Sequence, residues 1–294
     1  MKIGFIGLGI MGSRMAANLA KANYRIFLYN QTEEKAKALL SDRVVFKPSP
    51  AAVASGSDVV ITMLSTPEAV QEVAMGENGF LQSMEKGKIW MDCSTVNPSF
   101  SIQMAELCNS LGFNFLDSPV GGSLKPAETG DLVFMVGGKK GVVKYCEPLF
   151  DVMGRKTIHV GKNGMGSALK LVNNLVMGLS MYGFIEGLKL GESLGLNQDV
   201  IFDLFDGSPV AAQMVSMKRQ KIQQKNYSPE FPLQWLHKDL QLAAQTAYEQ
   251  GIPLPGANTV KEIFALAKQA GLGELDFTAI YQFLTKLKVN SDEI

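Results

Sequence analysis

Short apolar runs alternate with amphipathic stretches over the first half of the chain. The runs are rich in Ile, Val, Phe and Leu with little polar alternation, which is typical of strands buried on both faces of a parallel sheet. Helical patterns fall between them, at 11–21, 33–40 and 99–111. This alternation predicts an α/β fold built from βαβ units with right-handed crossovers. The predicted strands are KIGFIG, RIFLYN, DVVITML, KIWMDC, FNFLDS, LVFMVGG and KTIHVG.

The pattern changes after residue 161, beyond which only helices are predicted. A long helix is expected over 164–194, and glycines at 183, 187 and 191 predict that it packs closely against another helix. Shorter helices are expected at 199–205, 211–224, 233–250, 258–269 and 277–287. We therefore predict an N-terminal Rossmann dinucleotide-binding domain over residues 1–162. An all-α substrate and dimerisation domain over 163–294 follows, joined to it by the long interdomain helix.

Composition and charge remove several classes of function. The chain has 294 residues, of which 46% are hydrophobic, and its 28 basic residues balance its 28 acidic ones. Without a basic stripe, nucleic acid is not an expected partner. Charged residues such as Lys170 and Glu186 interrupt the most apolar stretch, so no membrane span is expected. Three cysteines without a C-x-x-C pair suit a reducing, cytoplasmic setting, and no metal site is predicted.

The segment GLGIMG at 7–12 is the first candidate for binding chemistry. It follows a predicted strand and opens a predicted helix, which is the context of the G-x-G-x-x-G turn that binds a dinucleotide. Its glycines allow a close backbone approach, and the helix N-terminus presents free N–H groups to a pyrophosphate. The cofactor contacts predicted here are Gly7, Leu8, Gly9, Ile10, Met11 and Gly12.

The end of the second strand predicts the 2′ substituent of the cofactor. An NAD site usually has Asp or Glu at this position, whereas this chain has Asn30, Gln31 and Thr32, with Lys35 further along. Without a carboxylate, the usual repulsion against a 2′-phosphate is missing. No arginine is present for a bidentate phosphate contact. The pattern favours NADP(H) and leaves NAD(H) open.

Three later loops, at 63–67, 92–96 and 117–123, are expected at the same edge of the sheet, where the carboxyl ends of parallel strands meet. Their N–H groups and hydroxyls suit a ribose or a small oxyanion. The last loop, DSPVGGS, presents the N–H groups of Gly122 and Ser123 to a substrate carboxylate. The cofactor contacts predicted in the other two loops are Met63, Leu64, Ser65 and Thr95.

Lys170 and Asn174 are four residues apart in GMGSALKLVNN, at the start of the long helix. At this spacing they project from one helix face, among apolar neighbours. A lysine and an amide in such a setting are unusual for a solvated surface. We predict a lysine in a cleft, supported by the asparagine.

Four motifs, in order, resemble the β-hydroxyacid dehydrogenase family over the whole chain. They are GFIGLGIMGSRMAANL at 4–19, DSPVGGS at 117–123, GMGSALKLVNN at 164–174 and KDLQLA at 238–243. Three further segments, KPAETGDL, FPLQWLHKDL and GLGELDFTAI, are most similar to the glyoxylate and succinic semialdehyde reductase branch. Members of that branch reduce small ω-aldehyde or oxo acids to hydroxy acids, usually with NADPH. The resemblance also leads us to expect a homodimer or homotetramer.

The resemblance implies a catalytic role for Lys170, with Asn174 as its supporting amide. The protonated lysine would stabilise the developing alkoxide and then donate its proton. Relatives usually have serine where this chain has Gly121, so the first hydroxyl of that loop is missing. Lys238 would approach the cofactor. The implied substrate contacts are Thr95, Gly122, Ser123, Phe231 and Asp239.

Two alternatives remain open at this stage. One is oxidation of a branched 3-hydroxy acid such as 3-hydroxyisobutyrate, which we would expect to accompany an acidic residue near position 30. The other is a dinucleotide-binding scaffold without catalysis, expected where the catalytic lysine has been replaced. The presence of Lys170, Asn174 and Asp239 favours an enzyme acting on a small aldehyde or hydroxy acid that bears a carboxylate.

Overall fold

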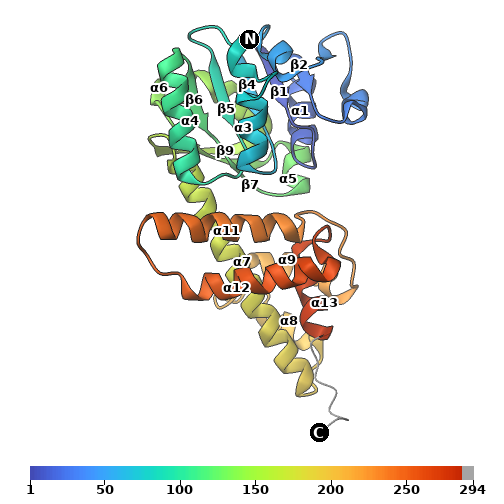
Figure 1. The fold of residues 1–294 in the computed structure, drawn as a ribbon. Coiled ribbons are helices and arrows are strands. Elements are labelled where there is room, and N and C mark those ends of the chain that lie inside the picture. The colour runs from blue at the N-terminus through green and yellow to red at the C-terminus, as the bar shows by residue number, and fades with distance from the viewer. Residues whose placement is uncertain (287–294) are drawn as a thin grey trace. The chain divides into compact units, whose positions relative to one another are not determined.

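A computed structural model describes residues 1–286 of the chain (Figure 1). The chain divides into two compact units, the first spanning Met1–Leu171 and the second beginning at Val172. The predicted boundary at 162/163 falls after the last strand, whereas this division falls within the long helix. The first turns of that helix therefore belong with the sheet.

The first unit is built around one sheet, which has nine strands within the described residues. The strand order is β3-β2-β1-β4-β5-β6-β8-β7, with β9 beside β8. Strands β1 to β6 are parallel, so they have the 3-2-1-4-5-6 order of the dinucleotide-binding fold. The strands are β1 (Lys2–Ile6), β2 (Arg25–Tyr29), β3 (Val44–Phe46), β4 (Val59–Thr62), β5 (Ile89–Asp92), β6 (Asn114–Asp117), β7 (Val120–Gly121), β8 (Leu132–Gly137) and β9 (Gly154–Gly161).

The sheet is not parallel throughout, because its pairing changes at one edge. Strand β8 is antiparallel to both β6 and β7, and β9 is parallel to β8. The reason is the short connection after β7, which consists of helix α5 (Leu124–Thr129) and Gly130 in the left-handed conformation. It reverses the chain directly instead of crossing over. The two shortest strands, β3 and β7, were not predicted.

Helices cover both faces of the sheet. A cluster of buried apolar residues packs α1 and α6 against one face, and a second cluster packs α2, α3 and α4 against the other. Figure 1 shows α3 and α4 in front of the sheet. The helices are α1 (Gly12–Lys21), α2 (Pro50–Ala54), α3 (Pro67–Met75), α4 (Pro98–Leu111), α6 (Lys140–Met153) and the 3-10 turns η1 (Glu33–Leu39) and η2 (Phe80–Ser83).

Two predicted helices take a different form. The segment predicted as a helix at 33–40 is the 3-10 helix η1, in which Ala36 is the single buried residue. The helix predicted at 211–224 is broken at Lys218 into α9 (Gln213–Met217) and α10 (Arg219–Gln223). The buried ammonium of Lys218 lies 2.7 Å from Glu230 and 3.3 Å from Asp276, and these ion pairs accompany the break.

The regular elements of the second unit's described residues are helices, joined by turns and by one isolated β-bridge between Pro232 and Asp276. It has one apolar core, to which α7 (Met165–Ser193) contributes Met181, Ile185 and Leu188. Figure 1 shows α11 and α12 side by side in this unit. The other elements are α8 (Gln198–Phe205), α11 (Leu233–Glu249), α12 (Pro255–Ala267), the π-helical turn η3 (Lys268–Leu272), η4 (Phe277–Ala279) and α13 (Ile280–Lys286). Residue 287, the last of the helix predicted at 277–287, lies outside the described residues.

Helix α7 is long and apolar enough to cross a membrane by length and composition, and it is the one described helix that meets this test. Core helices of soluble proteins meet it as well, so it is weak evidence for a span. Of the three glycines predicted to lie in a close helix contact, Gly191 packs against Ile201 of α8. A Cβ at Gly183 or Gly187 would meet no described atom within 4 Å. The close packing is therefore present at one of the three positions.

Candidate functional site

The turn between β1 and α1 contains three glycines, and each position requires glycine for a different physical reason. Gly7 has a φ of 101°, and a Cβ there would overlap the carbonyl oxygen of Met63. A Cβ at Gly12 would overlap the carbonyl oxygen of Gly7. Around Gly9, by contrast, no described atom lies within 4 Å of the Cβ position. The turn thus exposes bare backbone at Gly9 and Ile10, where a pyrophosphate can approach, so it fits a dinucleotide.

Asn30, directly after β2, uses its amide to shape this turn. Its Oδ1 accepts from the N–H of Leu8 at 2.8 Å, and its Nδ2 donates to the carbonyl of Thr32 at 2.9 Å. Asn30 and Gln31 also line a cavity of about 480 Å³. Thr32 begins η1, and Lys35 is exposed within it. The other lining residues are Tyr29, Glu33, Phe46 and Pro48, none of which was predicted.

The predicted loops after β4, β5 and β6 do lie at one edge of the sheet. Thr62, Asp92 and Asp117 end these strands and are paired in register. The loops are also joined, because the N–H of Leu64 donates to Ser94 Oγ at 2.9 Å. Ser65 is exposed and Thr95 is half-buried.

A buried carboxylate, that of Asp92, lies beneath these loops. It accepts hydrogen bonds from Thr62 Oγ1 at 2.7 Å and from the N–H of Ser94 at 3.1 Å, while its Oδ2 has no hydrogen-bond partner among the described residues. Burial raises the pKa of Asp92, and the charge of the neighbouring Asp117 acts in the same direction. Through its hydrogen bond to the N–H of Ser94, the Asp92 carboxylate helps to hold the loop after β5 in place.

Part of the DSPVGGS segment belongs to regular elements. Gly121 ends β7 and pairs with Val133 of β8, and Ser123 precedes α5. Gly122 has a φ of 121°, which requires glycine, whereas a Cβ at Gly121 would lie 3.1 Å from the flexible end of Met135. Neither the N–H of Gly122 nor that of Ser123 donates to an acceptor in the part of the chain that the structure describes. Both are exposed or half-buried, as an anion site needs.

Lys170 lies on α7 and is buried, with 9% of its surface exposed. It is one turn beyond Ser167, whose N–H and hydroxyl bond to Asp117 and Ser101. Sequence reasoning did not identify Asp117 as an anchor of this helix. The available signal was an aspartate at the end of an apolar strand, since aspartate is a residue type that caps helix N-termini.

The second unit brings together three of the predicted residues, Asn174, Lys238 and Asp239. Asn174 Nδ2 donates to Asp239 Oδ2 at 2.6 Å, and both residues are almost fully buried. Asn173 in turn donates to Asn174 Oδ1 at 2.8 Å, so the whole amide is fixed. Lys238 Nζ lies 2.9 Å from Asp239 Oδ1. Asn174 itself is four residues after Lys170 along α7.

Phe231 is half-buried and its backbone is fixed. Its N–H donates to Asp276 Oδ2 at 3.2 Å, and its carbonyl accepts from Phe277 at 2.9 Å. Its ring packs against Phe277 with centroids 6.1 Å apart. Of the two histidines, His159 bonds to the carbonyl of Gly138 at 2.9 Å. No group of three or more candidate metal ligands occurs among the described residues.

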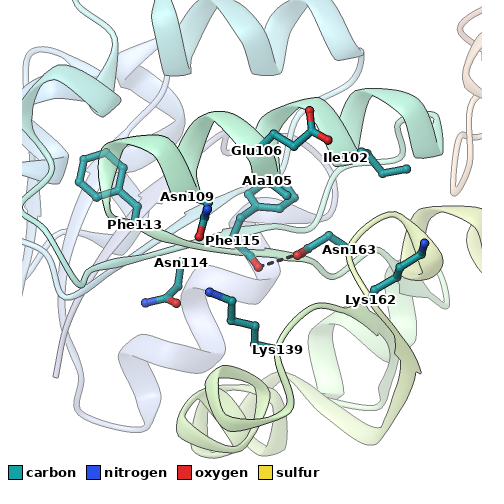
Figure 2. Close-up of a pocket in the computed structure, with 10 residues that line it drawn as sticks. All are labelled: Ile102, Ala105, Glu106, Asn109, Phe113, Asn114, Phe115, Lys139, Lys162 and Asn163. Carbon is teal, nitrogen blue, oxygen red and sulfur yellow. Dashed lines mark hydrogen bonds between the residues drawn. The ribbon is translucent and has the colours of Figure 1, made fainter.

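A second cavity lies elsewhere on the first unit, and no predicted site residue lines it. Its volume is about 370 Å³, and it lies between α4, β6 and the segment at 162–163. Figure 2 shows residues that line it, among them Ile102, Phe113 and Phe115, with the Lys139 side chain near Asn114. Asn163 is fixed at its edge by a hydrogen bond to the carbonyl of Phe115 at 2.9 Å.

The strand order and the bare glycine turn define a dinucleotide-binding protein of the Rossmann class, followed by a helical unit. Two family models match almost the whole chain. Residues 2–161 match the NAD-binding domain of 6-phosphogluconate dehydrogenase. Residues 164–284 match the NAD-binding domain of NADP-dependent 3-hydroxyisobutyrate dehydrogenase.

Individual relatives agree with these models. Glyoxylate/succinic semialdehyde reductase 1 of Arabidopsis thaliana is 36% identical over 282 residues, covering 96% of this chain and 98% of that one. The cytokine-like nuclear factor N-PAC of Homo sapiens is 32% identical over 281 residues, covering 96% of this chain and 51% of that one. The structure of Mycobacterium tuberculosis 3-hydroxyisobutyrate dehydrogenase with L-serine superposes with a TM-score of 0.87 at 29% identity, covering 96% and 98% of the two chains.

The chain therefore belongs to the 3-hydroxyisobutyrate dehydrogenase-like family of β-hydroxyacid dehydrogenases. It is an NAD(P)-dependent oxidoreductase that acts on CH–OH groups. The predictions of family, fold class and enzyme class are confirmed.

Proposed function

We propose that this protein is an NADP(H)-dependent reductase of small aldehyde or oxo acids, with glyoxylate and succinic semialdehyde as the substrates to test first. The observation that carries the proposal is the 36% identity to a reductase named for these substrates, along nearly the full length of both chains. Lys170, Asn174 and Asp239 are present, and all three are buried.

Lys170 acts as the proton donor in this proposal. When bound, the nicotinamide cofactor supplies the hydride to the carbonyl carbon. The ammonium of Lys170 donates a proton to the carbonyl oxygen as charge develops there, so the aldehyde gains one hydride and one proton and becomes an alcohol. The neutral amine then takes a proton from solvent. Asn174, fixed by Asp239, keeps the next turn of α7 in one arrangement.

The substrate carboxylate binds at the DSPVGGS loop in this proposal. The N–H groups of Gly122 and Ser123 have no described protein acceptor, and an oxyanion fits such adjacent donors. Because Gly122 has a positive φ and no side chain, the carboxylate can come close to the backbone. Thr95, Phe231 and Asp239 keep the substrate-binding roles that the resemblance implies, and Lys238 keeps its cofactor role.

NADP(H) is the proposed cofactor, because no carboxylate directly follows β2. Asn30 is less available than its sequence implies, since its Oδ1 is already bonded to Leu8 and its Nδ2 to Thr32. Glu33 lines the same cavity and would repel a 2′-phosphate near it. Glu33→Gln is therefore expected to lower the KM for NADPH while leaving that for NADH unchanged. If the ratio of the KM for NADPH to the KM for NADH is unchanged in Glu33→Gln, Glu33 has no role in the choice of cofactor.

A single panel tests the function. The purified full-length protein is assayed with glyoxylate and succinic semialdehyde as oxidants of NADPH and NADH, and with 3-hydroxyisobutyrate in the oxidising direction. We expect the highest kcat/KM with NADPH and one of the two aldehyde acids. Lys170→Ala should lower kcat by orders of magnitude and leave the cofactor Kd unchanged. Turnover near the wild-type rate in this variant would refute the role of Lys170.

Two observations favour specific alternatives. The structural similarity to a 3-hydroxyisobutyrate dehydrogenase supports oxidation of a branched 3-hydroxy acid. In that case the panel would show 3-hydroxyisobutyrate as the preferred substrate. The similarity to N-PAC, whose name states no enzyme activity, supports a dinucleotide-binding scaffold. A scaffold would bind cofactor and turn over none of the three substrates.

A homodimer or homotetramer, in a reducing cytoplasmic compartment, completes the proposal. The second-unit part of α7 exposes an apolar face with Gly183 and Gly187 at its centre, and such a face favours burial against another copy. Leu190→Glu should shift the mass measured by light scattering towards the monomer, whereas the same change at exposed Tyr248 should not. The exposed apolar residues of this face are Val172, Val176, Leu190 and Leu194.

A further inference from the structure

Asp117 is the last residue of β6, and 1% of its surface is exposed. Its carboxylate is bonded at both oxygens to the start of α7. Oδ1 accepts from the N–H of Gly164 at 2.9 Å, and Oδ2 accepts from the N–H of Ser167 at 3.0 Å. Asn163 Nδ2 lies a further 3.5 Å from Oδ1. Because the first N–H groups of a helix lack intrahelical partners, Asp117 acts as a cap supplied from 47 to 50 residues away.

Two further contacts hold the same turn to the sheet. Ser167 Oγ and Ser101 Oγ are 2.8 Å apart, and both serines are buried. A Cβ at Gly166 would lie 2.6 Å from the carbonyl oxygen of Asp117 and would overlap that of Met135. The helix backbone therefore lies directly against the strand ends. Contacts at residues 164, 166 and 167 together fix both the depth and the rotation of this turn.

The contacts at residues 164, 166 and 167 also determine the position of Lys170. It lies three residues after Ser167, about 4.5 Å further along the helix axis and near the same face. Rotation of α7 by 20° would move an atom ~6 Å from the helix axis by about 2 Å. A misplacement of ~1 Å can cost a reaction about a hundredfold in rate. The position of the Lys170 ammonium thus depends on the contacts at Ser167.

We propose that Asp117 is a positioning residue that sets the place of the Lys170 ammonium by capping α7 through Gly164 and Ser167. The inference rests on the proposed function, in which Lys170 is the proton donor. It assigns the first residue of DSPVGGS a purpose separate from the glycines that follow it. Asp117 has no contact with substrate or cofactor in this role.

Asp117→Asn is the first test variant. Both oxygens of Asp117 accept a backbone N–H, so an amide in its place necessarily turns its own NH₂ group towards one of these donors. We expect kcat to fall by about ten- to a hundredfold with the cofactor Kd unchanged. The pH profile of kcat should also shift, because the displaced ammonium no longer meets the reacting oxygen in the same surroundings. Asp58→Asn is the matched control, since Asp58 bonds to Lys2 and Lys88 and not to α7.

Ser101→Ala is the second, milder variant. It removes one contact of Ser167 and leaves the Asp117 cap intact, so it remains informative if Asp117→Asn does not fold. We expect a severalfold loss of kcat and faster hydrogen exchange of the amides at 164–170. Ser49→Ala is the matched control, because Ser49 caps α2 through Ala52 at 3.1 Å. It should leave kcat and the exchange of α7 unchanged.

The outcomes distinguish the proposed role of Lys170 from the proposed role of Asp117. If Lys170→Ala is inactive while folded Asp117→Asn and Ser101→Ala keep the wild-type kcat and pH profile, the positioning role of Asp117 is wrong and the proposed function stands. If Lys170→Ala keeps its turnover, the proposed role of Lys170 as proton donor fails and this inference fails with it. A loss of kcat in both test variants but in neither control supports the inference.

Discussion

Gly9 and Gly12 lie in the same turn, yet replacing each by alanine is expected to have opposite effects. A Cβ at Gly12 would overlap the carbonyl oxygen of Gly7, with its carbonyl carbon at 3.1 Å and the ring of Phe5 at 3.3 Å. Alanine in a helix is favoured over glycine by ~1 kcal/mol, but forcing a methyl group against backbone typically costs ~1–3 kcal/mol. Because the backbone cannot yield as a side chain can, we expect the cost to be ~2–3 kcal/mol, at the upper end of that range. The net loss of stability is then about 1–2 kcal/mol, which lowers the Tm by ~2–8 °C.

At Gly9 the same methyl group meets no described atom within 4 Å. The free protein should be as stable as the wild type or more stable by ~0.4–1 kcal/mol, because alanine has less freedom when unfolded. The methyl group would occupy the place where a pyrophosphate approaches the backbone. We expect the cofactor Kd to rise at least tenfold, which corresponds to about 1.4 kcal/mol.

The assay measures Tm by calorimetry without cofactor and Kd by titration with NADPH. Gly141→Ala is the control, since it also has nothing within 4 Å but lies on α6, away from the turn. It should match Gly9→Ala in stability and the wild type in Kd. A Gly9→Ala protein that binds NADPH within twofold of the wild type would contradict the assigned pyrophosphate position. A Gly12→Ala protein with the wild-type Tm would contradict the geometry of the turn.

Three other predictions follow from local structure. Burial raises the pKa of the thiols of Cys93, Cys108 and Cys146. The native protein should therefore react with Ellman's reagent far more slowly than the denatured protein, and a fast-reacting thiol in the native protein would contradict this. The Lys88 ammonium lowers the pKa of Asp58, so the stability it adds is present at neutral pH and lost as pH falls through that lowered value. The Tm gap between wild type and Asp58→Asn should therefore narrow below about pH 4 and not widen. Gly121→Ser should lower the KM for the preferred acid, whereas Gly122→Ala should raise it, because Gly122 has positive φ; equal effects would contradict the separate roles of the two glycines.

The fold could be predicted from the sequence wherever a local hydrophobic pattern or a single turn motif determines the structure. The apolar strands and the G-x-G-x-x-G turn specify the parallel part of the sheet, because both signals are local. The antiparallel β8 could not be predicted, since its direction depends on the conformation of Gly130, after α5. The break at Lys218 depends on Glu230 and Asp276, which are distant in sequence. Features set by local sequence signals were predicted, whereas features set by the conformation of one glycine or by residues distant in sequence were missed.

The same distinction explains what the sequence reveals of the site. Lys170 stands out locally as a charge on an apolar helix, but its anchoring by Asp117 involves a residue more than fifty positions earlier. Asp117 and Gly122 are five residues apart and are joined by the short strand β7, which is itself fixed to β8. The proposed carboxylate site and the proposed lysine anchor therefore share one rigid segment. A change within β7 that moves Gly122 should move Asp117 as well, so substitutions there are expected to alter KM and kcat together, whereas those at Asp117 alone alter kcat.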